Sequence, residues 1–224
     1  MKLVVFNGSP RGKRGNSRIL LDKFLQGFET TGGTFEIYYL KDLDEHPQYA
    51  ELFFQADAVF LAFPLYTDAM PGIVKAFVDE LKTHRPVSGE TGAQKHLFFL
   101  VHSGFPEAKH SALISRYLLK LAKRLNYECP GVIVKGGSEG IQDMPAKATK
   151  KLFQQFFQLG AIYGQTGQLD GEILQKIRGM EAIPWYLLPL LWVLQVTGLL
   201  NFMFNKELKK HGSFERRYDR PYWE

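Results

Sequence analysis

The sequence predicts an α/β fold, a doubly wound five-stranded parallel sheet followed by a helical carboxyl-terminal extension. Two observations lead to this prediction. Short apolar runs alternate with stretches whose apolar residues recur at helical spacing, and parallel strands need such long crossover connections. The run at 58–63 is apolar at every position, which is typical of a strand covered by helices on both faces of a sheet.

The elements follow from local patterns along the chain. In order, we expect strand 2–6, helix 17–28, strands 34–40 and 58–63, helix 71–84, strand 97–101, helix 113–125, strand 131–134 and helix 146–163. The first helix is expected because its apolar residues recur every three or four positions. The third strand is bounded by Asp57 and Pro64, and the next helix starts at Pro71 because proline suits a first turn. The last strand ends before a pair of glycines.

Length and composition fit one such domain with an appendage. The chain has 224 residues, of which 45% are hydrophobic, enough for a substantial core. We expect the domain at 1–165 and the extension, with a basic and aromatic tail, at 166–224. The first residues lead into a glycine turn and not into a signal-peptide apolar region, so we expect a cytoplasmic location.

Charge and cysteine content exclude several classes of protein. A net charge of +5 suits anionic ligands, but the basic residues gather only at the first loop and the tail. Nucleic acid is therefore not an expected partner. The single cysteine, Cys129, excludes an internal disulfide and an all-cysteine metal site, and we expect it to be a small buried hydrophobe. The six histidines show no metal-ligand spacing, so no metal is expected.

The loop between the first strand and the first helix has the composition of an anion cradle. It reads Asn7-Gly8-Ser9-Pro10-Arg11-Gly12-Lys13-Arg14-Gly15-Asn16-Ser17. Glycines let the backbone curl, Arg11 supplies charge, and Asn16 and Ser17 lie where a helix amino terminus concentrates unpaired N–H groups. The spacing matches neither a Walker A loop nor G-x-G-x-x-G. We therefore expect a monophosphate-sized site, the alternative being a surface loop with solvated basic side chains.

Further motif residues follow the third strand, and together with the first loop they resemble a known family. The motifs are Gly8-Ser9-Pro10-Arg11, Asn16-Ser17, Pro64-Leu65-Tyr66, Pro71-Gly72, Lys75 and Asp79. In this order they resemble the NADPH-dependent FMN reductases and related flavodoxin-like NAD(P)H oxidoreductases, over roughly residues 1–165. The resemblance implies a flavodoxin-like sheet of order 2-1-3-4-5, with FMN as cofactor and NAD(P)H as co-substrate; flavodoxin is the usual example of this strand order.

The resemblance also implies which residues contact the flavin. It assigns the FMN phosphate to Ser9, Arg11, Asn16 and Ser17, the isoalloxazine ring to Pro64, Leu65, Tyr66 and Thr67, and further flavin contacts to Ser103, Gly104 and Phe105. No side chain is expected to be catalytic, because the flavin carries the chemistry. A flavin ring offers a large apolar face to Leu65 and Tyr66. The alternative for Tyr66 is a core aromatic, and Lys75 with Asp79 is expected to be a helix-face pair. His102 beside Ser103 does not indicate a hydrolase, because no G-x-S-x-G surrounds the serine.

The extension carries an uncharged stretch at 182–204. As one helix it could just span a bilayer, but Pro184 and Pro189 interrupt its start and Gln195 and Asn201 would place amides in lipid. Three alternatives remain, namely a helix buried against the domain or a second copy, a lid over the flavin, and membrane contact.

Burial of that stretch is the favoured alternative, so a homodimer without membrane contact is expected. Trp185 and Trp192 are seven residues apart and would share a helix face. The tail at 214–223 mixes arginine with aromatics, and it would cover a neighbouring subunit's cofactor or form a plain surface tail.

These observations predict an FMN-dependent NAD(P)H oxidoreductase that passes hydride or electrons to a small acceptor such as a quinone or a flavin. One alternative is an electron carrier like flavodoxin. Such carriers tend to dock through acidic surfaces, and a net charge of +5 argues against this alternative. The other alternative is a non-catalytic flavin-fold protein that binds partners through 182–204.

Overall fold

The sheet holds five parallel strands in the order β2-β1-β3-β4-β5, as the sequence predicts. The computed structural model describes residues 1–85, 95–199 and 201–220. The strands are β1 (Lys2–Asn7), β2 (Thr34–Tyr39), β3 (Ala58–Pro64), β4 (His96–His102) and β5 (Val132–Lys135). Contacts divide the chain into two units, Met1–Ala182 and Ile183–Glu224, and the sheet lies in the first.

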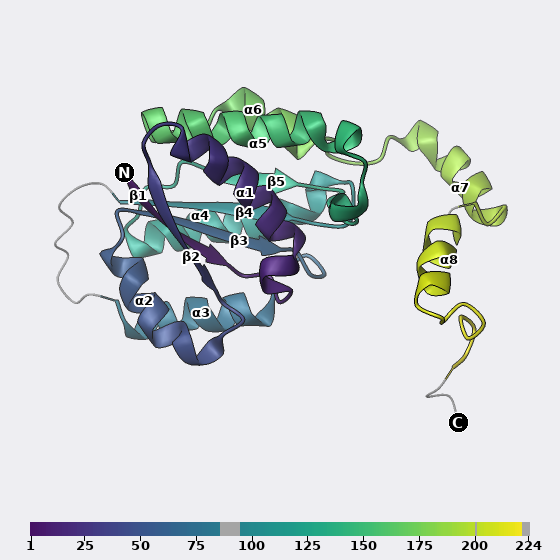
Figure 1. Cartoon of the computed structure of the whole chain (residues 1–224), viewed down its shortest axis with the longest axis horizontal. Coiled ribbons are helices and arrows are strands. Elements are labelled where there is room, and N and C mark those ends of the chain that lie inside the picture. Colours follow the sequence, from purple (N-terminus) through teal and green to yellow (C-terminus); the bar gives the residue numbers. More distant parts are fainter. Residues whose placement is uncertain (86–94, 200, 221–224) are drawn as a thin grey trace. The chain divides into compact units, whose positions relative to one another are not determined.

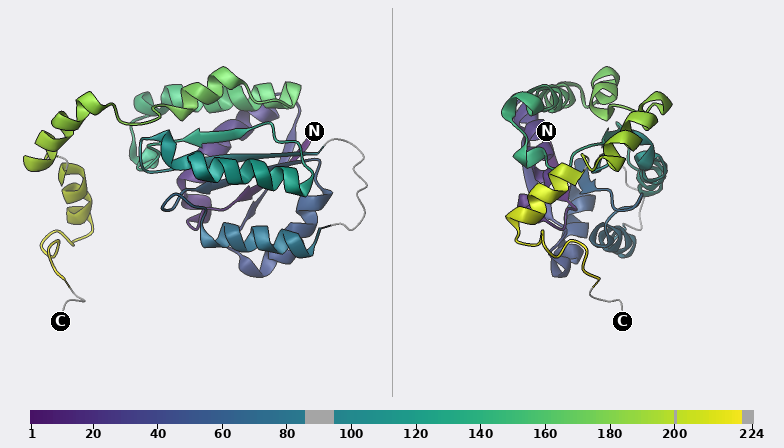
Figure 2. Two further views of the ribbon diagram at one scale, coloured as in Figure 1. Left: turned by 180° about the vertical axis from the view of Figure 1, so that it is seen from behind. Right: turned by 90° about the vertical axis from the view of Figure 1, so that its right-hand side faces the viewer.

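Helices cover both faces of this sheet (Figure 1 and Figure 2). The pleat sends alternate residues of β1 to opposite sides. Val4 and Phe6 join the core beneath α2 (His46–Gln55), α3 (Gly72–Thr83) and α4 (Ala112–Leu125). Leu3 and Val5 join the core beneath α1 (Asn16–Glu29) and α5 (Ala146–Thr166). Two cores therefore hold the sheet, and its carboxyl edge is free to carry loops.

Helices α1 and α5 approach each other closely through glycines. A Cβ atom at Gly27 would lie 1.9 Å from the Phe157 carbonyl oxygen, and one at Gly160 would lie 1.9 Å from the Phe24 carbonyl oxygen. Both positions therefore need glycine. This packing fixes the axis of α1, whose amino terminus meets the first loop.

Two helices lie where the sequence analysis placed no element. Helix α2 is short, with Pro47 in its first turn, a position at which proline is tolerated. Helix α6 (Gly171–Arg178) is capped by the Asp170 carboxylate, which accepts a hydrogen bond from the Ile173 N–H at 2.8 Å. The first unit therefore runs past residue 165, and the boundary placed there stays a prediction.

Cys129 is half-buried, and burial raises the pKa of its thiol.

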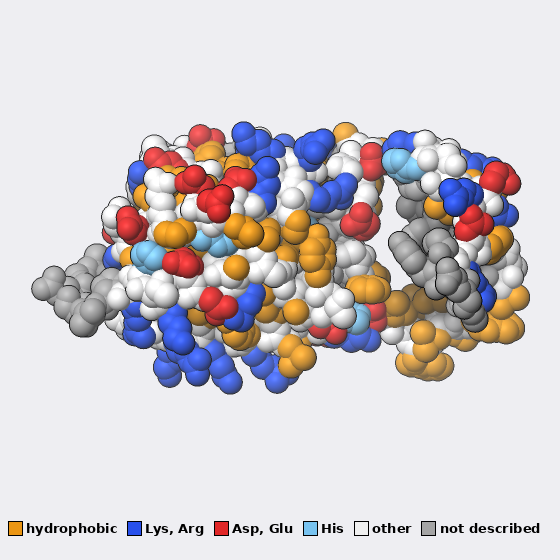
Figure 3. All heavy atoms as spheres, turned by 90° about the horizontal axis from the view of Figure 1, so that it is seen from below, with side chains coloured by type: hydrophobic (Ala, Val, Ile, Leu, Met, Phe, Trp, Pro, Cys, Tyr) orange, Lys and Arg blue, Asp and Glu red, His pale blue; other side chains and the backbone are white. Residues whose placement is uncertain are grey.

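The second unit is helical but is not one helix. It contains a 3₁₀ turn η5 (Trp185–Leu187), then α7 (Leu188–Val196) and α8 (Asn201–Lys210), with Gly198 at φ +73° between the two helices. Trp185 therefore lies in the 3₁₀ turn and Trp192 in α7. Many of its apolar side chains are exposed (Figure 3). Among the described residues, no helix is long and apolar enough to cross a bilayer. Positions 221–223 of the expected tail lie outside the described residues.

Candidate functional site

The three loops singled out in the sequence follow neighbouring strands at one edge of the sheet. Asn7 at the end of β1 pairs in register with Ala62 of β3, and Pro64 at the end of β3 pairs with His102 of β4. Strand order reverses between β1 and β3, which is where open α/β sheets bind ligands. The fold thus brings together loops that are separated by up to about 90 residues in the chain.

The first loop is a tight turn built around a buried serine. The Gly8 N–H donates to the Ala62 carbonyl at 2.7 Å, and the Ser9 N–H donates to Asn7 Oδ1 at 2.9 Å. Gly12 has a φ of +55°, a left-handed conformation that favours glycine. A Cβ atom at Gly15 would lie 2.5 Å from Ser9 Oγ, so the backbone wraps closely around this hydroxyl.

Two amide side chains of this loop have a buried atom without a partner. Asn16 Nδ2 donates to the Ser138 carbonyl at 2.9 Å, which leaves Asn16 Oδ1 unpaired, and Asn7 Nδ2 is unpaired as well. A buried polar atom without a partner costs about 1–3 kcal/mol. Such atoms are uncommon in folded proteins and call for an explanation, which a bound ligand would supply.

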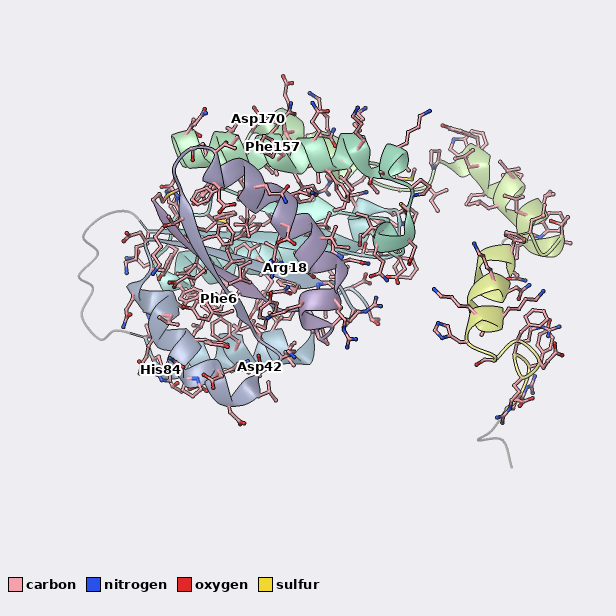
Figure 4. The ribbon with its side chains drawn as sticks, in the orientation of Figure 1. Phe6, Arg18, Asp42, His84, Phe157 and Asp170 are labelled. Carbon is pink, nitrogen blue, oxygen red and sulfur yellow. The ribbon has the colours of Figure 1, made fainter. Side chains whose placement is uncertain are left out.

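Helix α1 begins at Asn16 with Gly15 as its N-cap, and no side chain caps its first turn. The positive end of the helix dipole and the uncapped N–H groups favour an anion there. Arg11, Lys13 and Arg14 are exposed beside it and add positive charge. The start of α1 is held in place by Arg18, which donates to Tyr39 OH and pairs with Asp22 (Figure 4).

A buried hydrogen-bond chain connects the first turn of α1 with the ends of β4 and β5. Ser138 Oγ donates to the Ser103 carbonyl at 3.0 Å, so it accepts from His102 Nδ1 at 2.8 Å. His102 Nε2 is then the unprotonated nitrogen and accepts from Ser17 Oγ at 2.7 Å. Burial lowers the pKa of His102 to about 4, which keeps the imidazole neutral. The predicted phosphate ligand Ser17 therefore has its hydroxyl proton directed to His102.

The loop after β3 is a hairpin that presents an aromatic side chain. Tyr66 and Ala69 exchange backbone hydrogen bonds of 2.9 and 3.1 Å, and the Leu65 N–H donates to the His102 carbonyl at 2.7 Å. Thr67 and Asp68 have φ values of 47° and 60°, which is strained for residues with a Cβ. Pro64 and Leu65 are buried, whereas the Tyr66 side chain is 49% exposed and is therefore not a core aromatic.

The loop after β4 contributes a second exposed ring. Ser103 is buried and its hydroxyl donates to the Phe105 carbonyl at 3.0 Å, whereas Gly104 and Phe105 are exposed. The Phe105 ring lies 5.0 Å from the His110 ring, and His110 Nδ1 lies 3.1 Å from Asp68 Oδ1. This contact links the second loop to the 3₁₀ turn η3 (Ala108–Ser111) that follows the third loop.

Sequence reasoning missed the roles of His102 and Ser138. Ser138 lies 122 positions after Asn16, and its carbonyl accepts a hydrogen bond from the Asn16 side-chain amide. No local motif connects the two residues. The half-buried Lys135 was also not singled out. Burial lowers the pKa of Lys135, and its ammonium donates to the Gly136 carbonyl. None of the described residues form a group of three potential metal ligands.

Solved structures with the same fold share little sequence with this chain. The FMN-dependent NADH-azoreductase of Bacillus anthracis, solved in complex with FMN, is 14% identical over 73% of this chain and 99% of its own, with a TM-score of 0.56. The NAD(P)H:quinone oxidoreductase of Methanothermobacter marburgensis is 14% identical over 72% of this chain and 94% of its own, with a TM-score of 0.58. The NADPH-quinone reductase of P. pentosaceus is 18% identical over 70% of this chain and 96% of its own, with a TM-score of 0.52.

The sequence matches none of the curated proteins with which it was compared. A family model does match it. The model describes the flavodoxin-like fold and covers residues 1–154, which include all three loops of the candidate site. The chain therefore belongs to the flavodoxin-like fold family.

Proposed function

We propose that this protein is an FMN-dependent NAD(P)H oxidoreductase that passes hydride or electrons to a small acceptor, such as a quinone, an azo compound or a flavin. One observation carries the proposal. At the switch point of the sheet, an anion-binding loop with unpaired buried amide atoms meets two loops with exposed aromatic rings. Structural neighbours described as FMN-dependent azoreductases and NAD(P)H:quinone oxidoreductases support it.

The residues present fit FMN. A phosphate dianion suits the amino terminus of α1, which no side chain caps, because the first backbone N–H groups of a helix, here those of Asn16 and Ser17, have no intrahelical acceptor; Ser9 and Arg11 precede them in the same loop. The free Nδ2 of Asn7 can donate to an oxygen, and the free Oδ1 of Asn16 can accept from a hydroxyl. Both needs are met by the ribityl phosphate portion of a flavin mononucleotide.

The ring portion would lie along the second and third loops. Pro64, Leu65, Tyr66 and Thr67 form the second loop, and Ser103, Gly104 and Phe105 form the third. The exposed Tyr66 and Phe105 rings offer apolar faces, and the backbone N–H groups of tight loops can donate to ring nitrogens and oxygens. FMN, when bound, supplies the capacity to accept hydride from a reduced nicotinamide and to reduce an acceptor.

The chain's own contribution is binding and positioning. His102 is neutral and buried, so it orients the strand ends and does not supply a proton. The strained Thr67-Asp68 turn is held by paired backbone hydrogen bonds, which fixes where Tyr66 stands. Holding nicotinamide and acceptor in turn against one surface, with water excluded, lowers the entropic part of the barrier.

Anaerobic visible spectroscopy tests the proposal. The purified chain is mixed with FMN, separated from free FMN, and titrated with NADPH and with NADH. Loss of the flavin band with either nucleotide, and its return on adding a quinone, is the expected result. Reduction only in the presence of a separate reductase would instead indicate an electron carrier, and absence of FMN binding would overturn the proposal.

A further inference from the structure

The second unit carries apolar side chains that its own fold leaves uncovered. Trp185 is 80% exposed, Trp192 65% and Val196 67%. Gln195 is the only polar side chain in α7, so this helix is apolar on every side. A helix that is apolar all round is normally buried in a core or in lipid. The exposed surface of α7 therefore needs an occupant.

The length and charge of the second unit limit what that occupant can be. Helix α7 has nine residues and is about 14 Å long, less than half of a bilayer's roughly 30 Å hydrocarbon core. Over 206–220 the chain has six lysines and arginines against three acids, directly after the uncharged stretch. In the second unit of Figure 3 the orange and the blue side chains gather mostly at different ends.

We propose that the second unit is an interfacial membrane anchor, in which α7 is immersed among the outer acyl chains of a bilayer with anionic headgroups, and α8 with residues 211–220 faces those headgroups. Aromatic rings such as Trp185, Tyr186 and Trp192 favour the boundary between headgroups and acyl chains. Short apolar helices followed by cationic residues bind anionic lipid through both buried area and charge.

Charge favours lipid over a second copy of the chain. In a twofold dimer the same patch meets itself, so the cationic residues of 206–220 would lie near their own equivalents. A dimer helix also needs one apolar face only, with polar residues on the other side. An anionic lipid surface satisfies both the all-round apolar α7 and the cations that follow it. This inference replaces the expectation that the stretch avoids membranes.

The anchor also limits the chemical class of the electron acceptor, and this step rests on the proposed function. A reductase held at a bilayer surface has access to apolar acceptors dissolved in lipid. A long-chain quinone is such an acceptor, and it is of the class reduced by the quinone oxidoreductases among the structural neighbours. In the overall reaction NAD(P)H gives up two electrons and a proton, and the quinone takes these together with a second proton from water to become the quinol.

Vesicle flotation of the full chain tests the anchor without involving the flavin. The vesicles contain phosphatidylcholine alone or with about one third phosphatidylglycerol. We expect binding to the anionic vesicles and a blue shift of tryptophan emission. Trp192→Glu combined with Val196→Glu should weaken binding at least about 100-fold, because two apolar side chains would no longer be buried. Leu113→Glu, a leucine 66% exposed on α4, is the matched control and should bind as the wild type does.

The contribution of the cationic side chains to vesicle binding is tested separately. Lys206→Glu combined with Lys209→Glu should weaken binding to anionic vesicles roughly 10-fold or more and leave any binding to neutral vesicles unchanged. Equal binding to neutral and anionic vesicles would overturn the anionic headgroup part. A chain that stays with the aqueous phase, and instead forms a dimer that Trp192→Glu disrupts, would overturn the anchor in favour of a second copy.

Turnover separates failure of the anchor from failure of the proposed function. With NADPH, a vesicle-dissolved long-chain quinone should be reduced at least about 10-fold more slowly by the Trp192→Glu, Val196→Glu variant, since its vesicle binding is lost. A water-soluble quinone should be reduced equally by both proteins. Equal rates with both quinones would overturn the assigned acceptor. Vesicle binding without reduction of either quinone would overturn the oxidoreductase proposal and leave the anchor standing.

Discussion

Replacing His102 with glutamine should remove a pH dependence from the free energy of unfolding. The imidazole is fully buried in its neutral form, and burial lowers its pKa from the ordinary 6.5 to about 4. In the unfolded chain the same group takes up a proton near pH 6.5. Below that pH the unfolded state therefore binds more protons than the folded state, and stability falls as pH falls.

The size of the effect follows from the two pKa values. At pH 7.5 the histidine is neutral in both states and contributes almost nothing. At pH 5 the unfolded state is protonated and the folded state is still mostly neutral, which costs the folded state about 2 kcal/mol. The loss develops between pH 6.5 and pH 4, and it reaches about 3 kcal/mol below the folded-state value.

Urea unfolding followed by far-ultraviolet circular dichroism measures this dependence. The wild type should lose about 2 kcal/mol more than His102→Gln on going from pH 7.5 to pH 5, because all other titrations are common to both proteins. His84→Gln, at a less buried histidine directly after α3, is the control and should keep the wild-type dependence. Equal losses in wild type and His102→Gln would refute the neutral, buried imidazole and the hydrogen-bond chain inferred from it.

Three further predictions concern the first loop, the helix packing and the strained turn. Arg11→Ala should weaken FMN binding about 10-fold in fluorescence titrations, through loss of a charge-assisted contact, and Arg116→Ala on α4 should leave it unchanged. Gly27→Ala should lower the unfolding free energy by about 3 kcal/mol, because its Cβ would overlap a carbonyl of α5, whereas Gly72→Ala has open space and should be neutral or stabilising. Thr67→Gly should raise the melting temperature slightly by relieving a φ of 47°, and a fall would show that the turn is not strained.

The strands were predictable from sequence because each is defined by its own residues. The run at 58–63 is apolar at every position and emerges as β3, buried at every position. Helix α2 was not found, since its ten residues give only a short pattern. Tertiary contacts stabilise it, with the rings of Tyr49 and Phe53 packing against Phe6. The break near Gly198 was likewise not foreseen, because uncharged composition alone does not show where a helix ends.

The candidate site, like the fold, was only partly predictable from the sequence. Residues 7–17 are adjacent in sequence, so the glycines and basic residues of the first loop, together with the expected start of the first helix, indicate a phosphate site. The contacts of His102 with Ser17 and Ser138 span 85 and 36 positions, and they exist only because β1, β4 and β5 end at one edge. Local patterns can propose what a loop binds, whereas the groups that orient the loop come from topology.

The direction of that hydrogen-bond chain also decides how a phosphate can be held. Ser138 gives its proton to the Ser103 carbonyl, so His102 donates from Nδ1 and takes the proton of Ser17 at Nε2. A hydroxyl whose proton is already used cannot donate to a phosphate oxygen, which only accepts. Under the proposed function, a bound phosphate would therefore be held by the backbone N–H groups at the start of α1, with Ser9 and Arg11 beside them. In this arrangement the hydrogen bond from Ser17 to His102 fixes the first turn of α1. The Ser17 side chain would then position those N–H groups and would not itself contact the phosphate.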